Sequence, residues 1–187
     1  MNFPAGLMPN DHSIEFFRDS ENPEISHAIM LRMIMRVKDL PDDIKKSLWA
    51  DIMTHPDKSA WLKLNAYTGD AALEKYCSCV FGLIDHEADF ANGIFFHSEY
   101  VPCEIRETCS GNGILCNKLT VGDGQELTSR QVAVLTQIGR CRLNKEIADS
   151  LSISPETVKI HIKHIQQKAG VMNKKDLVLL AHKKQLV

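Results

Sequence analysis

The sequence predicts a mainly α-helical chain: a helical N-terminal region, an irregular cysteine-rich segment and a C-terminal bundle of four short helices. Apolar residues recur at helical spacing in three short blocks between residues 127 and 170, and similar patterns run through residues 13–76. Five of the six cysteines fall between residues 77 and 116. We expect the following division of the chain: a mobile arm over 1–12, an N-terminal domain over 13–120, a linker over 121–126 and a C-terminal domain over 127–187.

Composition places the chain among globular proteins, with 187 residues of which 44% are hydrophobic and 25% are charged. No apolar run approaches the roughly 18 residues that a membrane helix needs. The N-terminus lacks the basic and then apolar pattern of a signal peptide, so a cytoplasmic protein is expected. In that compartment, six cysteines suggest metal or redox chemistry before disulfides.

The N-terminal patterns favour helices. Pro4, Gly6 and Pro9 interrupt the proposed arm, and a short helix is expected over 13–20. The segment Pro23–Lys38 is apolar on nearly all sides, which predicts a helix covered by neighbours: either a core helix or one with a surplus face for dimerisation. Further helices are expected over the following ranges: 42–53, 57–67 and 71–76.

The segment that begins at Cys77 is rich in cysteine and glycine and has no clear period. Its cysteines are spaced for a tetrahedral thiolate site, for which we select Cys79, Cys103, Cys109 and Cys116. Cys77 is then a core or spare thiol, and His97 is a replacement ligand. Structural zinc is the first interpretation, while a sensing iron–sulfur cluster and unliganded reduced cysteines stay open. The acidic run around His86 is interpreted as a turn with a helix cap rather than a catalytic centre.

The three C-terminal blocks carry helix start signals. Thr128 or Ser129 can cap the first helix, Asn144 or the residue before it the second, and Ser154 the third. Pro155 follows at the first helical position, where its missing N–H is tolerated. Only residues 152–154 separate the second block from the third, the length of a helix-turn-helix turn.

The third block has one apolar and one cationic face. Val158, Ile162, Ile165 and Ala169 are predicted to point inward, whereas Lys159 and Lys163, four residues apart, share the exposed side. Such a helix fits the major groove of DNA. A solvated surface helix is the plainer alternative.

These segments, LTSRQVAVL, NKEIADSLSIS and TVKIHIKHIQQKAGV, closely resemble the DNA-binding domain of the LuxR family of transcription regulators. The resemblance covers residues 127 to about 180 and implies four helices, the third in the major groove and the fourth used for dimer contacts. It implies the following roles: base contacts by Lys159, Ile160 and Lys163, and phosphate contacts by Thr157, Lys145 and Lys168. Ser154 and His164, at the start and on the polar face of the third block, complete the predicted DNA-binding set.

Two positions depart from the family pattern. Gln131 replaces an acidic residue, which leaves a local ion pair in question, and Cys141 replaces a glycine, so it either adopts a left-handed conformation or the turn differs. The cysteine-bearing segment is also similar to the N-terminal domains of some LuxR-type regulators of Bacteroidetes and their mobile elements. That resemblance assigns no metal.

The formal charge of −2 conceals an asymmetry. From residue 127 onward there are eleven Lys and Arg against four Asp and Glu, whereas residues 1–126 hold eleven basic and twenty acidic residues. A basic domain joined to an acidic one is typical of a DNA binder with a second task. We therefore expect a transcription regulator rather than an enzyme, with double-stranded DNA, a second copy of the chain and RNA polymerase as partners. The alternative is a protein-interaction module of a mobile element whose helix-turn-helix docks a partner protein.

Overall fold

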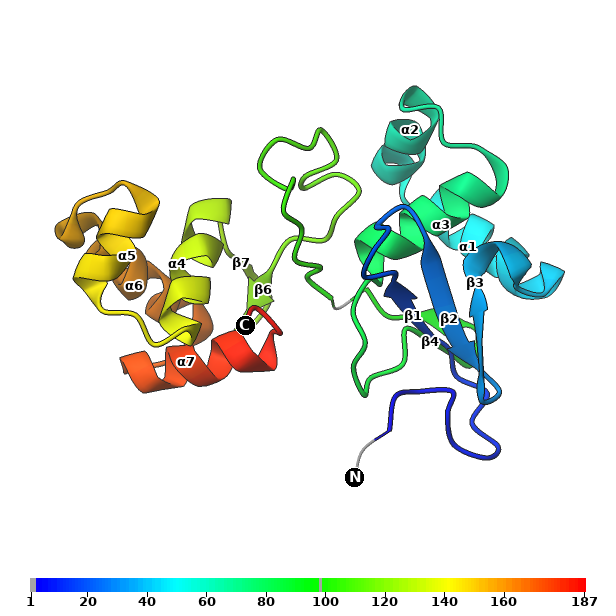
Figure 1. Cartoon of the computed structure of the whole chain (residues 1–187), viewed down its shortest axis with the longest axis horizontal. Helices are drawn as coiled ribbons and strands as arrows, with labels where there is room; N and C mark the ends of the chain where they lie inside the picture. Colours follow the sequence, from blue (N-terminus) through cyan, green and yellow to red (C-terminus); the bar gives the residue numbers. More distant parts are fainter. Residues whose placement is uncertain (1–2, 98) are drawn as a thin grey trace. The chain divides into compact units, whose positions relative to one another are not determined.

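The computed structural model describes residues 3–97 and 99–187, and it divides into two units, Met1–Asn117 and Lys118–Val187 (Figure 1). Helices dominate the described residues, so the prediction of a mainly α-helical chain is confirmed. Within these ranges, every helix is too short or too polar to cross a bilayer.

The N-terminal unit begins with a three-stranded antiparallel sheet, which contradicts the helices predicted over 13–20 and Pro23–Lys38. Its strands are β1 (Glu15–Arg18), β2 (Ser26–Met30) and β3 (Met33–Arg36), in the order β1-β2-β3. Leu31 and Arg32, with φ of 49° and 66°, form the two-residue turn between the paired Met30 and Met33. Both positive φ values match a type I′ hairpin turn, although neither residue is typical of it.

Three helices follow this sheet: α1 (Asp42–Thr54), α2 (Pro56–Leu64) and α3 (Gly69–Val80). The α3 helix packs against β1 and β2, and α1 packs against α2 and α3. A 3-10 turn over Val37–Asp39 leads from β3 into α1. Asp42 and Asp43 lie in the first turn of α1, where negative charge is favoured, and Pro56 occupies the first turn of α2. The ends of these helices lie within three residues of the predicted ranges, except that α3 continues beyond residue 76 through Cys77 and Cys79 to Val80.

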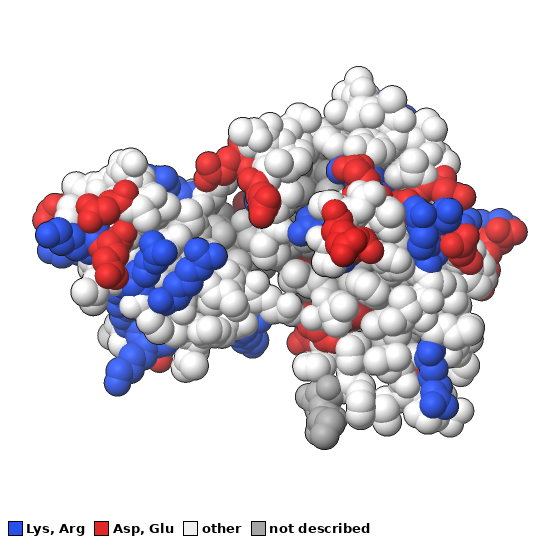
Figure 2. Space-filling model, viewed as in Figure 1, with Lys and Arg blue, Asp and Glu red and all other residues white. Residues whose placement is uncertain are grey.

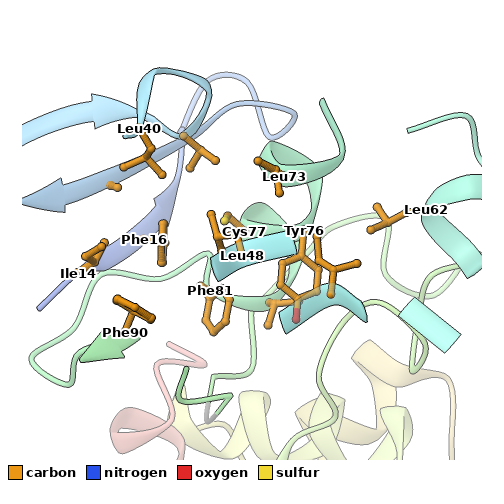
Figure 3. Close-up of a cluster of buried hydrophobic side chains, with 14 of the residues drawn as sticks. Ile14, Phe16, Leu40, Leu48, Leu62, Leu73, Tyr76, Cys77, Phe81 and Phe90 are labelled. Carbon is orange, nitrogen blue, oxygen red and sulfur yellow. The ribbon is translucent and has the colours of Figure 1, made fainter. Parts of the chain in front are cut away.

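The α3 helix is the centre of the unit. Its buried residues meet the inner face of the sheet and α1 around Phe16, Leu48, Tyr76, Cys77 and Phe81 (Figure 3). Polar contacts also fasten the sheet to this helix, since the Arg36 guanidinium donates to both carboxylate oxygens of Glu74 at 2.9 and 3.0 Å.

The remainder of the unit is a long segment with one short hairpin, β4 (Phe90–Ala91) and β5 (Ile94–Phe95). A bridge between Ile14 and Phe90 attaches it to the start of β1. Residues 3–12, predicted as a mobile arm, form turns that reach the sheet: Ala5 is buried, and the Gly6 carbonyl accepts from the Arg32 amide at 2.8 Å.

The C-terminal unit contains a hairpin and four helices. The hairpin, β6 (Thr120–Val121) and β7 (Gln125–Glu126), occupies most of the segment predicted as a linker. The helices are α4 (Ser129–Gly139), α5 (Asn144–Leu151), α6 (Pro155–Ala169) and α7 (Lys174–Lys183). Gly139 permits close packing of α4 on α7, because a Cβ there would lie 2.6 Å from the Ala181 Cβ.

Candidate nucleic-acid interface

The turn between α5 and α6 is built by three residues. Ser152 ends α5 in the left-handed conformation, with φ of 53°, and the Ile153 amide donates to the Ala148 carbonyl at 3.0 Å. Ser154 then caps α6, since its hydroxyl accepts from the Thr157 amide at 3.0 Å. These contacts fix the direction in which α6 leaves α5, as a helix-turn-helix requires.

The inward side of α6 anchors it to the unit. Val158 and Ile165 are fully buried, while Ile162 and Ala169 are half-buried. Together they form the apolar stripe predicted from the sequence. Because this stripe packs against the other helices, the opposite face of α6 is fixed and open to solvent.

The outward side of α6 carries most of the residues predicted to read DNA. Lys159, Lys163 and His164 are exposed, and the side chain of Ile160 is 54% exposed between them. Lys145 is exposed on α5. Within residues 3–97 and 99–187, no carboxylate forms an ion pair with these lysines. Their charges therefore remain available to a polyanion.

Lys168 has a different position from the other predicted contacts. Its ammonium donates to the Glu126 carbonyl at 2.7 Å and to the Gln131 side-chain oxygen at 2.9 Å. This lysine therefore links the end of α6 to β7 and to the start of α4. A phosphate contact would compete with these two bonds.

Gln131 performs two tasks at the position where the related family has an acidic residue. Its side-chain oxygen accepts from the Thr128 amide at 3.0 Å, and its own amide donates to the Thr128 hydroxyl at 3.3 Å, which completes a capping box. The same oxygen receives the Lys168 ammonium. The ion pair in question is therefore replaced by a charge-assisted hydrogen bond.

Arg130 is a positioning residue that the sequence reading missed. Its guanidinium donates to the Leu151 carbonyl at the end of α5, where a cation also complements the helix dipole. Burial lowers the pKa of His161 on α6, and the positive charges of Arg130 and His164 lower it further. Arg130 belongs to the segment LTSRQVAVL, but its bond to Leu151 spans 21 residues and cannot be read from spacing.

Cys141 adopts the left-handed conformation that was one of its two predicted alternatives, with φ of 58°. Its amide donates to the Ile138 carbonyl at 2.8 Å, and the Arg142 amide donates to the Gln137 carbonyl at 3.2 Å. These bonds close the C-terminus of α4, as a glycine would in the same place.

The four cysteines selected as metal ligands lie in the N-terminal unit, and two of them meet. The Cys79 thiol on α3 donates to the Cys116 sulfur. This hydrogen bond, together with Arg106, Lys75 and Lys58, lowers the pKa of Cys116 to about 6. The same pairing, together with burial, raises the pKa of Cys79. A thiolate at Cys116 thus lies among positive charges.

Cys103 and Cys109 lie on the irregular segment that ends at Cys116. The Cys109 sulfur accepts from the Gly111 amide at 3.3 Å. Two groups of metal-capable side chains have ligand atoms within 4.8 Å of one another in the described residues, and neither contains a cysteine. The structure therefore brings Cys79 and Cys116 together without assembling the four-thiolate set.

The remaining candidates are placed elsewhere. Cys77 is fully buried in the apolar core, and burial raises its pKa. His97 contacts Asp51 through Nε2 at 3.0 Å, and Tyr76 donates to the other oxygen of that carboxylate at 2.6 Å. His97 is thus engaged in this hydrogen-bonded set.

Charge is distributed unevenly over the two units. Lys and Arg side chains gather on the face of the C-terminal unit in view, and Asp and Glu side chains form several groups on the N-terminal unit (Figure 2). This agrees with the count from the sequence, in which residues after 126 hold eleven Lys and Arg. The α5 and α6 helices themselves carry both signs: the basic residues are Lys145, Lys159, Lys163 and Lys168, and the acidic residues are Glu146, Asp149 and Glu156.

Residues 125–181 match the sequence model of the family described as "Bacterial regulatory proteins, luxR family". The predicted LuxR-type helix-turn-helix domain is thereby confirmed; the resemblance of the cysteine-bearing segment lies outside the match and stays a prediction. Relatives named "Oxygen regulatory protein NreC" from Staphylococcus aureus strains JH9 and USA300 are 41% identical over 61 residues. That alignment covers 33% of this chain and 28% of each relative. No solved structure matches the chain.

Proposed function

We propose that the chain is a sequence-specific transcription regulator that inserts α6 into the major groove of duplex DNA. One observation carries this proposal: α6 is fixed by a buried stripe on one side, and its opposite side presents Lys159, Ile160 and Lys163 with no carboxylate partner among the described residues. Side chains in this arrangement reach base edges and phosphates when a helix-turn-helix lies in the groove.

Binding as a homodimer is the second part of the proposal. Two copies would read half-sites about one helical turn apart, roughly 34–36 Å. The α7 helix supplies a surface of suitable chemistry, since Leu179 is 68% exposed beside half-buried Val178. RNA polymerase is a further proposed partner at the regulated promoter.

The test is loss of sequence-specific affinity in the double variant Lys159→Ala, Lys163→Ala. DNA sites would first be selected from a random duplex library with the full chain, and affinity for the selected site would then be measured. Losing two base contacts at ~1–3 kcal/mol each weakens specific binding tens- to thousands-fold. Unfolding should change little, because both side chains are exposed.

The matched control is Lys46→Ala, Lys63→Ala, which removes the same charge from exposed positions on α1 and α2. This control should retain specific affinity. The slope of log affinity against log salt should also be steep and negative, near −0.9 for each neutralised phosphate. Equal affinities of the two double variants, or binding indifferent to salt, would favour the protein-docking alternative.

We also propose that Cys79, Cys103, Cys109 and Cys116 hold zinc, with an iron–sulfur cluster as the second candidate. The support is chemical: the Cys79 thiol donates to the Cys116 sulfur, and Arg106, Lys75 and Lys58 favour the thiolate form that metals require. Cys103 is close enough to influence the pKa of Cys79. The other two thiols would have to move toward this pair when the metal binds.

Metal analysis and absorption spectra of anaerobically purified protein test the cysteine site. A filled four-thiolate site gives about one zinc per chain, whereas a cluster gives iron, sulfide and visible absorption. Cys116→Ala should lose the metal, and Cys141→Ala, at an exposed position in the other unit, should keep it. Metal-free wild-type protein, or equal metal content in both variants, would remove the site from the proposal.

A further inference from the structure

A buried carboxylate lies on the outer face of the N-terminal sheet. Glu15 begins β1 opposite Ile29, and the alternation of a strand directs it away from the face of Phe16, whose ring belongs to the apolar core. Even so, Glu15 is 0% exposed. The segment between α3 and β5 contacts it, since the Asp85 amide donates to the Glu15 carboxylate.

Two further acids join Glu15 from distant parts of the chain. Asp85 precedes β4 and Glu99 follows β5, and carboxylate oxygens of the three lie within 4.8 Å of one another. The backbone holds this arrangement, because Glu15 Oε1 accepts from the Asp85 amide at 2.7 Å and Glu99 Oε2 accepts from the Leu83 amide at 3.1 Å. These bonds fix the carboxylates before any ligand arrives.

The second oxygen of each buried glutamate lacks a partner. Glu15 Oε2 and Glu99 Oε1 are shielded from solvent and accept no hydrogen bond in the described part of the chain. Glu99 itself is only 7% exposed. No Lys, Arg or His of residues 3–97 and 99–187 forms an ion pair with either glutamate or with Asp85. Buried carboxylates without a counter-charge are strongly unfavourable.

The titration behaviour agrees with this geometry. Burial raises the pKa of Glu15 to about 8 and that of Glu99 to about 8. Asp89, whose Oδ2 accepts from the Phe16 amide at 2.7 Å, adds a fourth carboxyl with a pKa raised by burial and by these neighbours to about 10. The repulsion is relieved either by protons or by a cation.

We propose that Glu15, Asp85 and Glu99 form a binding site for one divalent cation of the oxygen-preferring class, which comprises Ca²⁺, Mg²⁺ and Mn²⁺. Every side chain of this group offers carboxylate oxygen, and none offers nitrogen or sulfur. The unpartnered oxygens of the two glutamates supply ligands, and water completes the coordination shell. The cation fastens β1 to the segment around β4 and β5, and so stabilises the N-terminal unit.

This site is distinct in chemistry from the cysteine site proposed above. Ca²⁺ and Mg²⁺ bind thiolates poorly, so a titration with these ions does not report on Cys79 or Cys116. Failure of the cysteine proposal and failure of this one are therefore separable. Neither result bears on DNA binding by α6.

The experiment is a calorimetric titration of the metal-stripped full chain at neutral pH with Ca²⁺, Mg²⁺ and Mn²⁺ salts in turn. Thermal unfolding followed by tryptophan fluorescence accompanies it, because Trp49 and Trp61 both belong to the N-terminal unit. We expect one equivalent of at least one of the three ions to bind. The unfolding temperature should rise with its concentration, because the ion binds the folded state.

Glu15→Gln and Glu99→Gln should each weaken this binding ~10-fold or more, as loss of supporting groups does at metal sites. Glu21→Gln removes an exposed carboxylate from the same unit and should bind as the wild type does. Asp85→Asn, at a half-exposed position, gives the same test if a buried variant does not fold. Absence of saturable binding at millimolar cation, or equal affinity in all variants, overturns the proposal.

Discussion

Replacement of Cys141 by glycine should stabilise the C-terminal unit, and the reason lies in the backbone. Cys141 closes α4 with φ of 58°, a conformation that brings the Cβ of any L-residue close to a carbonyl oxygen. The side chain is exposed, and its thiol is 3.9 Å from the Gly139 carbonyl. Little favourable interaction is therefore lost when the side chain is removed.

The expected gain follows from two opposing terms. A left-handed conformation costs an L-residue ~1–2 kcal/mol, which glycine avoids. Glycine in turn loses more conformational entropy on folding, ~0.5–1 kcal/mol. Their difference predicts a net gain of up to about 1.5 kcal/mol for Cys141→Gly. Cys141→Ala keeps the Cβ and should be neutral or slightly destabilising.

Hydrogen exchange of the slow amides in α4 and α5 measures this gain in the full chain, because such amides report the free energy of opening of their unit. Tryptophan fluorescence supplies an internal control, since Trp49 and Trp61 lie in the other unit. The free energy of opening should rise for Cys141→Gly while the fluorescence transition stays in place. Equal values for Cys141→Gly and Cys141→Ala would refute the reasoning from backbone strain.

Three further changes test other parts of the chain. Ser154→Ala removes the cap of α6 and should lower the stability of the C-terminal unit by ~0.5–2 kcal/mol, measured by the same exchange experiment. Gly139→Ala should cost ~1–3 kcal/mol there, because the new Cβ would lie 2.6 Å from that of Ala181. In metal-free protein, the pKa values of Glu15 and Glu99, raised from 4.5 to about 8, mean that the folded state holds protons that the unfolded state releases. Urea unfolding followed by tryptophan fluorescence should therefore show stability falling as pH rises from 5 to 8, by up to about 1.4 kcal/mol per pH unit for each proton, whereas Glu15→Gln should flatten the curve.

The C-terminal unit could be predicted from the sequence because its signals are local. Ser154 and Pro155 mark the start of α6 within one turn, and Val158 and Ile165 show by spacing alone which side is buried. Gln131 departs from the family pattern, but its bond to Lys168 spans 37 residues and cannot be read from spacing.

The sheet was missed for a physical reason. The segment 23–38 is apolar on nearly all sides, and an apolar run without a period fits a buried helix and a buried hairpin equally well. The deciding feature is the turn at Leu31 and Arg32, two residues with positive φ that carry no turn signature. Pairing of β2 with β1 on one side and β3 on the other then overrides local propensity.

The acidic site could not be found from sequence because its members are far apart. Glu15 and Asp85 are separated by 70 residues, and their segments are brought together by the bridge between Ile14 and Phe90 and by the bond from the Phe16 amide to Asp89. The acidic run around His86 was interpreted as a turn, and the Asp85 side chain does accept from the Glu87 amide at 2.6 Å. Asp85 therefore has two roles: it accepts a hydrogen bond within its own turn, and it lies beside Glu15. Residue spacing in the sequence predicts only the turn.

The position of Cys116 connects the cysteine pair to the DNA-binding unit through the chain itself. Asn117, which follows it, is the last residue of the N-terminal unit and is held there by three bonds: from Lys58 at 3.0 Å, to the Val80 carbonyl at 3.2 Å and from the Arg106 guanidinium. Lys58 and Arg106 also favour the thiolate of Cys116. A change in charge at that sulfur therefore acts on the same two cations that hold Asn117. Residues 118 and 119 follow Asn117 in the chain, and the hairpin that Lys168 joins to α6 begins at Thr120.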